Sequence, residues 1–118
     1  MSPSDAGIEV HELDGLWEES VGDPRELFEG DDPQVQARSY VIRPGERVPE
    51  MGTTSHGGPE LSVVLSGEVV LGLPDEDGDE EYAVGPDTFV TIPAGTEHYS
   101  ENRTDDPVKL VYTVVGDL

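Results

Sequence analysis

The sequence predicts an all-β fold, a small sandwich or barrel. Two observations support this prediction: short runs of β-branched and aliphatic residues recur along the chain, and Pro, Gly or acidic turn residues bound each run. The 118 residues are the length of one ordinary domain. Within it we expect an irregular N-terminal segment with an edge strand at residues 1–34, followed by the barrel at residues 35–118.

The N-terminal segment carries weak and broken signals. Residues 1–6 are expected to be disordered, and Ile8–Leu13 alternates apolar and polar residues as a weak strand does. Residues 14–33 are acidic and interrupted by Asp-Pro pairs, which break regular structure. A short helical turn is expected at Arg25–Phe28, and the first strand of the barrel at Gln34–Arg43, before Pro44-Gly45.

The rest of the chain reads as short strands joined by turns. Ser66-Gly67 separates two apolar runs, and the acidic residues 74–81 form the tip of a hairpin. This acidic segment lacks the spacing of a helix-loop-helix calcium site, so we interpret it as a solvated turn. The strands are expected at Leu61–Leu65, Glu68–Leu73, Tyr82–Val84, Thr88–Ile92, His98–Ser100 and Val108–Val115.

The charge of the chain is strongly negative. Its 27 acidic and 6 basic residues give a formal net charge of −21, and Lys109 is the only lysine. An acidic, lysine-poor composition throughout a globular chain resembles that of proteins from salt-accumulating halophiles; the alternative is a mesophilic acidic protein with an acidic binding partner. Nucleic acid is excluded as a partner, because phosphate contacts need basic patches.

Composition also excludes several other classes. No run of about 18 apolar residues predicts a membrane span, and the acidic N-terminus does not resemble a secretory signal. The absence of cysteine excludes thiolate metal sites and is consistent with a cytoplasmic protein. No motif of a nucleophilic triad or of a phosphate-binding glycine loop is present.

Two motifs carry the chemistry of the chain. The first is His56-Gly57-Gly58-Pro59-Glu60, followed six residues later by Gly67, and the second is Pro93-Ala94-Gly95-Thr96-Glu97-His98, followed by Asn102. Each places its histidine at the edge of an apolar strand. Two imidazoles and one carboxylate that converge in a barrel make a metal site with open positions. The third histidine, His11, is expected on the surface.

These motifs resemble those of the cupin family over roughly residues 35–115. His56, Glu60 and Gly67 match the second half of the first cupin motif, and Pro93 to Asn102 match the second half of the other. Two positions depart from the pattern. Thr54 stands where the first motif has another histidine, and Asp87 stands where the second motif begins with glycine.

The resemblance implies a double-stranded β-helix, a jelly-roll barrel in which the two motifs lie on neighbouring hairpins. It implies a divalent metal, Fe, Mn, Ni or Zn, held by His56, Glu60 and His98 without a fourth protein ligand. Three polar residues are expected to line the pocket and orient water or substrate: Thr54, Ser62 and Ser100. The resemblance further implies a homodimer.

Three functions remain open from the sequence. The first is a metal-binding cupin whose barrel pocket takes a small polar metabolite, as an oxygenase or an isomerase. The second is a non-catalytic module that binds a sugar or small effector without metal. The third is a stress or storage protein without a ligand, in which side chains fill the barrel.

Overall fold

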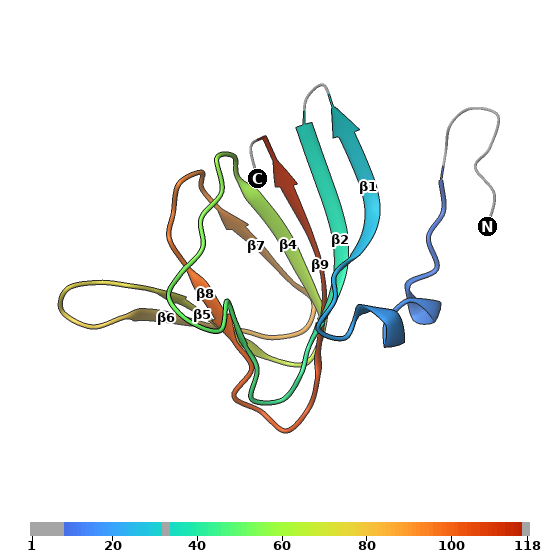
Figure 1. Cartoon of the computed structure of the whole chain (residues 1–118). Coiled ribbons are helices and arrows are strands. Elements are labelled where there is room, and N and C mark those ends of the chain that lie inside the picture. Colours follow the sequence, from blue (N-terminus) through green and yellow to red (C-terminus); the bar gives the residue numbers. More distant parts are fainter. Residues whose placement is uncertain (1–8, 32–33, 117–118) are drawn as a thin grey trace.

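The fold is two antiparallel β-sheets that face each other, and the computed structural model describes residues 9–31 and 34–116 (Figure 1). The described strands are β1 Arg25–Asp31, β2 Gln34–Ile42, β3 Arg47–Val48, β4 Glu60–Ser66, β5 Val69–Leu73, β6 Glu80–Val84, β7 Thr88–Ile92, β8 Tyr99–Glu101 and β9 Val108–Val115. One sheet has the order β1-β2-β9-β4-β7, and the other has the order β3-β8-β5-β6. The predicted all-β jelly-roll barrel is therefore confirmed.

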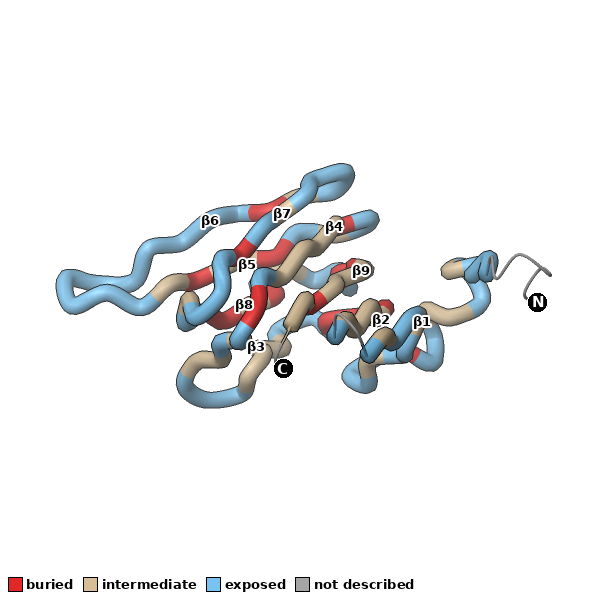
Figure 2. The backbone as a smooth tube through the Cα atoms, turned by 90° about the horizontal axis from the view of Figure 1, so that it is seen from above, coloured by how far each residue is buried: buried red, intermediate tan, exposed pale blue. Residues whose placement is uncertain are grey.

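The core lies between the two sheets. Tyr40 on β2 is in register with Leu110 on β9, which is in register with Val64 on β4, so these three side chains share the inner face. Figure 2 shows that the buried positions concentrate where the sheets face each other. Seven buried residues form the core cluster: Tyr40, Ile42, Val64, Val69, Val84, Val108 and Leu110. Their burial is the main stabilising contribution to the barrel.

The expected helical turn at Arg25–Phe28 is wrong. These residues belong to β1, which pairs with β2 along its whole length and lies at the edge of the five-stranded sheet. Backbone hydrogen bonds to a neighbouring strand outweigh a weak local preference for a helical turn. A register shift between Glu26 and Phe28 marks a bulge in this edge strand.

The expected strand at Ile8–Leu13 is also not formed. Ile8 and residues 1–6 lie outside the described residues, and 9–12 have no regular structure. Two short 3₁₀ turns follow, at Leu13–Gly15 and Glu18–Ser20. The hydroxyl of Ser20 hydrogen-bonds that of Ser39 on β2 at 2.8 Å, and both serines are fully buried. No helix in the described chain has the length and apolarity to cross a bilayer.

Two of the turns with a left-handed backbone bear on the motifs. Gly67 has φ of 83°, and a Cβ atom at this position would lie 2.4 Å from the carbonyl oxygen of Pro107. Asp87 has φ of 61°, and its amide donates to the carbonyl of Val64 at 2.8 Å. Aspartate enters this region more readily than most side chains. Asp87 can therefore replace the glycine that usually begins the second motif.

Asn102, the last residue of the second motif, has a structural role. Its side chain is fully buried, and its amide donates to the carbonyls of Ile42 at 3.0 Å and Asp106 at 2.7 Å. Its carbonyl oxygen accepts from the backbone amide of Thr104 at 2.9 Å. These bonds join the end of β8 to the end of β2 and satisfy backbone groups that water cannot reach.

Candidate metal centre

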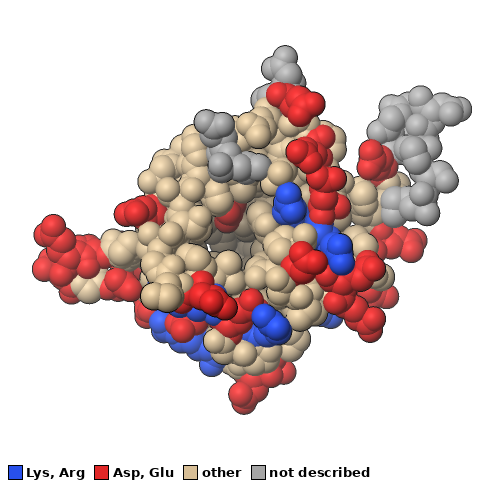
Figure 3. Space-filling view, viewed as in Figure 1, with Lys and Arg blue, Asp and Glu red and all other residues tan. Residues whose placement is uncertain are grey.

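The two sheets enclose a cavity of about 430 Å³ that opens to solvent. Figure 3 shows this opening as a hollow in the molecular surface. Most of the lining side chains are apolar, including Ile42, Leu71 and Val90. The polar lining residues include the six predicted ones: Thr54, His56, Glu60, Ser62, His98 and Ser100. A cavity of this size does not agree with the filled barrel that the storage hypothesis expects.

The elements of the barrel direct the two motifs toward this cavity. Glu60 begins β4, and the alternation of a strand places it on the inner face with Ser62 and Val64. His56 lies in the loop before β4, where its carbonyl accepts a hydrogen bond from the amide of Gly95 at 2.8 Å. This bond ties the first motif directly to the second.

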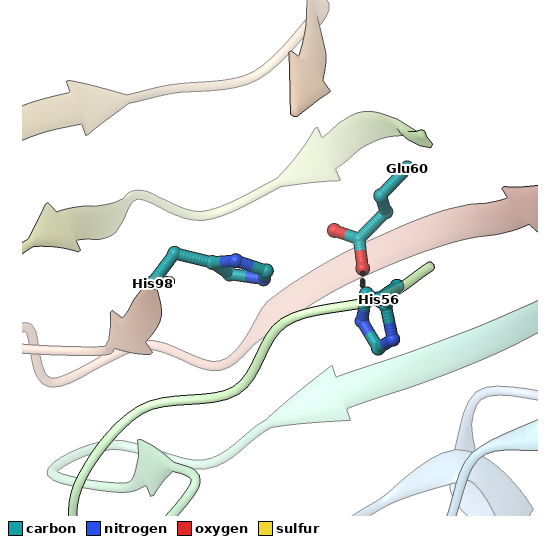
Figure 4. A group of neighbouring side chains, drawn as sticks. All are labelled: His56, Glu60 and His98. Atoms are coloured by element: carbon teal, nitrogen blue, oxygen red, sulfur yellow. Dashed lines mark ion pairs between the residues drawn. The ribbon is translucent and has the colours of Figure 1, made fainter. Parts of the chain in front are cut away.

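His56, Glu60 and His98 converge on one point of the wall (Figure 4). One ligand atom from each lies within 4.8 Å of the other two. Nε2 of His56 is 3.3 Å from Oε1 of Glu60, and the two imidazole centroids are 5.8 Å apart. Ligand atoms at about 2.1 Å from a cation lie about 3 to 4 Å from one another. Small side-chain rotations therefore bring the cluster to the spacing of a metal site.

The hydrogen bonds of the cluster fit a cation. Nδ1 of His98 is 2.8 Å from the carbonyl oxygen of Thr96, which can only accept, so this nitrogen carries the proton. The lone pair of Nε2 is then free to bind a metal, in the arrangement typical of metal-binding histidines. His98 is 4% exposed, while the side chains of His56 and Glu60 are 22% and 15% exposed. The site is thus shielded but reachable through the cavity.

The three residues predicted to orient water or substrate differ in their contacts. Ser62 donates a hydrogen bond from its hydroxyl to Oε2 of Glu60 at 3.2 Å, which orients the carboxylate. Thr54 pairs with His98 through the backbone, and Ser100 on β8 lies in register with Leu71 on β5 within the four-stranded sheet. His11 is exposed and pairs with Glu9 at 3.4 Å, as expected of a surface residue.

Two tyrosines in the cavity wall were missed by the sequence analysis. Burial, followed by the charge of Glu46, raises the pKa of Tyr40 to about 12. Burial also raises the pKa of Tyr112, an effect opposed by the positive charge of Arg38 and reinforced by the negative charge of Glu60. The alternation of β9 places Tyr112 on the same face as Leu110, but the sequence does not reveal which strands lie beside β9.

The fold and the cluster define a small double-stranded β-helix protein with a candidate metal centre inside its barrel. The chain belongs to the cupin family, since the Cupin domain family model matches residues 38–115. The comparison with curated proteins finds no match.

Several solved structures share this fold. A Klebsiella pneumoniae protein with a double-stranded β-helix domain has a TM-score of 0.72 at 17% identity, covering 99% of this chain and 92% of its own. The protein TT1209 of Thermus thermophilus has a TM-score of 0.70 at 23% identity, covering 92% and 99%. The protein BH2720 of Bacillus halodurans has a TM-score of 0.68 at 26% identity, covering 80% and 70%.

Proposed function

We propose that this cupin binds one divalent cation through His56, Glu60 and His98 and presents it to a small organic molecule in the barrel cavity. The convergence of these three side chains within 4.8 Å at the cavity wall carries the proposal. Two neutral imidazoles and a carboxylate suit Fe, Mn, Ni or Zn, and three protein ligands leave positions open.

The chemistry proposed is that of an oxygenase or an isomerase. A cation held in this way acts as a Lewis acid or supports oxygen chemistry on a bound molecule. Neighbouring protein groups orient the candidate ligands for this cation. The carbonyl of Thr96 fixes the tautomer of His98, and Ser62 holds the carboxylate of Glu60 in place. The apolar walls exclude water from the bound molecule, which strengthens every polar interaction there.

Metal content tests this proposal. Wild-type protein purified in high salt without chelator is expected to carry about one Fe, Mn, Ni or Zn per chain by elemental mass spectrometry. His56→Ala and His98→Ala are expected to abolish the stoichiometric metal. His11→Ala, which removes an exposed histidine away from the cavity, is the matched control and should retain it. A metal-free wild-type protein that takes up none of the four on incubation would refute the metal site.

A metal-free binding module is the second candidate function. The observation that favours it is Thr54, a hydroxyl at the position where the cupin motif places another imidazole. In this case a sugar or small effector would stabilise the metal-free protein by mass action. Thermal unfolding of chelator-treated protein with candidate ligands distinguishes the two functions. A binding module is stabilised by its ligand without metal, whereas the proposed oxygenase or isomerase needs the metal for its chemistry.

We further propose a homodimer formed by the outer face of the five-stranded sheet. Across β9, β4 and β7, two rows of residues lie in register on this face, and neither contains a charged side chain. Phe89, at the end of one row, is 62% exposed. The rows are Thr113, Leu61 and Thr91, and Val111, Val63 and Phe89. An uncharged face on so acidic a chain is typical of a surface that another subunit covers.

Sedimentation equilibrium tests the dimer. Val63→Glu introduces a charge at the centre of the face and should convert the dimer to a monomer, because two buried carboxylates would oppose each other. Met51→Glu, at a loop residue that is 87% exposed, adds the same charge elsewhere and should remain dimeric. A wild-type protein that is monomeric at high salt would contradict the proposal.

The acidic composition also leads us to propose that the protein works in a salt-rich cytoplasm.

A further inference from the structure

A basic residue lies beside the cavity, on the inner face of the five-stranded sheet, and the metal site does not use it. Arg38 on β2 lies directly opposite Tyr112 on β9, and Tyr112 lies directly opposite Ser62 on β4. Directly opposed residues on antiparallel strands share a face, and both Tyr112 and Ser62 line the cavity. Arg38 therefore belongs to the same inner row, two strands away from the candidate metal ligands. Figure 3 shows basic groups beside the hollow, on the side where β1 and β2 lie.

The surroundings of Arg38 leave its charge available. Its guanidinium donates one hydrogen bond, to the side-chain carbonyl of Gln36 at 3.1 Å. Within residues 9–31 and 34–116 it makes no ion pair, whereas Arg43 and Arg103 each pair with glutamates. On β1, Glu26 lies directly opposite Arg38, and Glu29 lies close enough for an electrostatic interaction with it. Neither carboxylate comes within ion-pair distance of Arg38. Arg38 is also half-buried, which strengthens a bond to any anion it meets.

The phenol of Tyr112 completes a second polar end of the cavity. Tyr112 on β9 lies between Arg38 on β2 and Ser62 on β4, and Ser62 hydrogen-bonds Glu60 of the metal cluster. A neutral phenol donates a hydrogen bond and can share an anion with a guanidinium. The rest of the cavity wall is mostly apolar and includes Val90 and Leu110.

We propose that the cavity binds a small monocarboxylate with an aromatic or branched-alkyl body, its carboxylate held by Arg38 and Tyr112 and its other end directed at His56, Glu60 and His98. This inference rests on the proposed function in taking the cavity as the ligand site. Two inter-strand spacings, about 10 Å, separate the backbones of Arg38 and Ser62, so a ligand of one ring or a short branched chain is long enough to reach over the sheet from the Arg38–Tyr112 pair to the metal cluster. The sequence led us to expect a small polar metabolite, but the mostly apolar lining favours an amphipathic one.

A local cation also resolves an electrostatic difficulty. A chain with a net charge of −21 repels anions over most of its surface. An anionic ligand therefore needs a fixed positive charge at the edge of its site, and Arg38 supplies it beside the cavity-lining Tyr112. The acidic surroundings make binding depend on this single residue.

Fluorine NMR titration tests the proposal with a matched pair of probes, 4-fluorophenylacetate and its neutral analogue 2-(4-fluorophenyl)ethanol. Wild-type protein should bind the carboxylate more tightly than the alcohol. Arg38→Gln should weaken binding of the carboxylate probe about tenfold and change binding of the alcohol probe little. Arg25→Gln removes the same charge from the outer side of the neighbouring strand and is the control that should leave both probes unchanged. Tyr112→Phe, which keeps the core volume, should weaken binding of the carboxylate probe more than binding of the alcohol probe.

The outcomes separate this inference from the metal proposal. The titration is repeated on the His56→Ala variant, in which no metal is expected. Carboxylate binding that depends on Arg38 in both proteins supports the inference even if the wild type contains no metal. Equal affinity for the two probes, no binding of either, or equal losses in Arg38→Gln and Arg25→Gln would each overturn it, whatever the metal content.

Discussion

Thr54 and His98 form a reciprocal pair of backbone hydrogen bonds, in which each amide donates to the carbonyl of the other at 2.9 Å. Both residues line the cavity. Two residues paired in this way project their side chains to the same side. Position 54 therefore faces the candidate metal centre, and the hydroxyl found there occupies the place of the imidazole expected from the cupin motif.

Thr54→His is expected to complete a four-ligand site. The added imidazole projects beside His98, so metal affinity should rise at least about tenfold, or about 1.4 kcal/mol. Competition titration with a chromogenic chelator measures the change. Thr53→His, one residue earlier and pointing away by the alternation of extended chain, is the control that should leave affinity unchanged. Unaltered affinity in Thr54→His would mean that position 54 does not face the metal.

Gly58, in the first motif, is expected to tolerate no side chain. A Cβ atom at this position would lie 1.3 Å from the carbonyl oxygen of Val115, so β9 or the loop before β4 must move. Gly58→Ala should lower the free energy of unfolding by about 3 kcal/mol or more. Gly15→Ala meets no atom within 4 Å and is the control. Chemical denaturation compares them, and similar midpoints would show that the two segments are not in contact.

Glu46 is expected to contribute stability that disappears in acid. Burial opposes its charged form, but the backbone and side-chain hydrogen bonds from Arg43 outweigh this effect, and the pKa of Glu46 is lowered below its usual 4.5. A lowered pKa in the folded state stabilises the protein above pH 4.5 and ceases to do so as the pH falls through the folded value. Glu46→Gln should therefore cost about 1 to 2 kcal/mol at pH 7 and progressively less below pH 4.5.

The difference in unfolding free energy between wild type and Glu46→Gln, followed from neutral to acid pH, measures this contribution. Glu68→Gln, at an exposed residue between β4 and β5, corrects for the general loss of repulsion as carboxylates are protonated. A difference that stays constant with pH would show that the charge of Glu46 has no part in stability.

Salt is expected to stabilise the protein. Like charges on a chain of net charge −21 repel one another in the folded state. Raising KCl from about 0.1 M to about 1 M shortens the screening length from about 10 Å to about 3 Å, so the melting temperature should rise. Calorimetry in KCl measures it, with a neutral osmolyte at matched osmolality as the control. A melting temperature that is flat or falls with KCl would argue against the halophile interpretation.

Much of the site was predictable because motif spacing and strand alternation are local properties. Glu60 and Ser62 could be placed on one face from the two-residue period of a strand alone, and His56 from its place in the first motif. Arg38 could not, because its role depends on β9 lying between β2 and β4. The strand at Arg25–Asp31 was missed for a similar reason, since its hydrogen-bond partner is β2 and the local sequence favours no single structure.

The sequence by itself determined the all-β class, the acidic surface and the three candidate metal ligands, because composition, turn residues and periodicity are local properties of the chain. Only the tertiary structure decided what surrounds those residues. It brought Thr54 beside His98, placed Arg38 and Tyr112 in the same row as Ser62, and left the cavity open with mostly apolar walls. These relationships depend on strand order and register, which arise when distant segments pair.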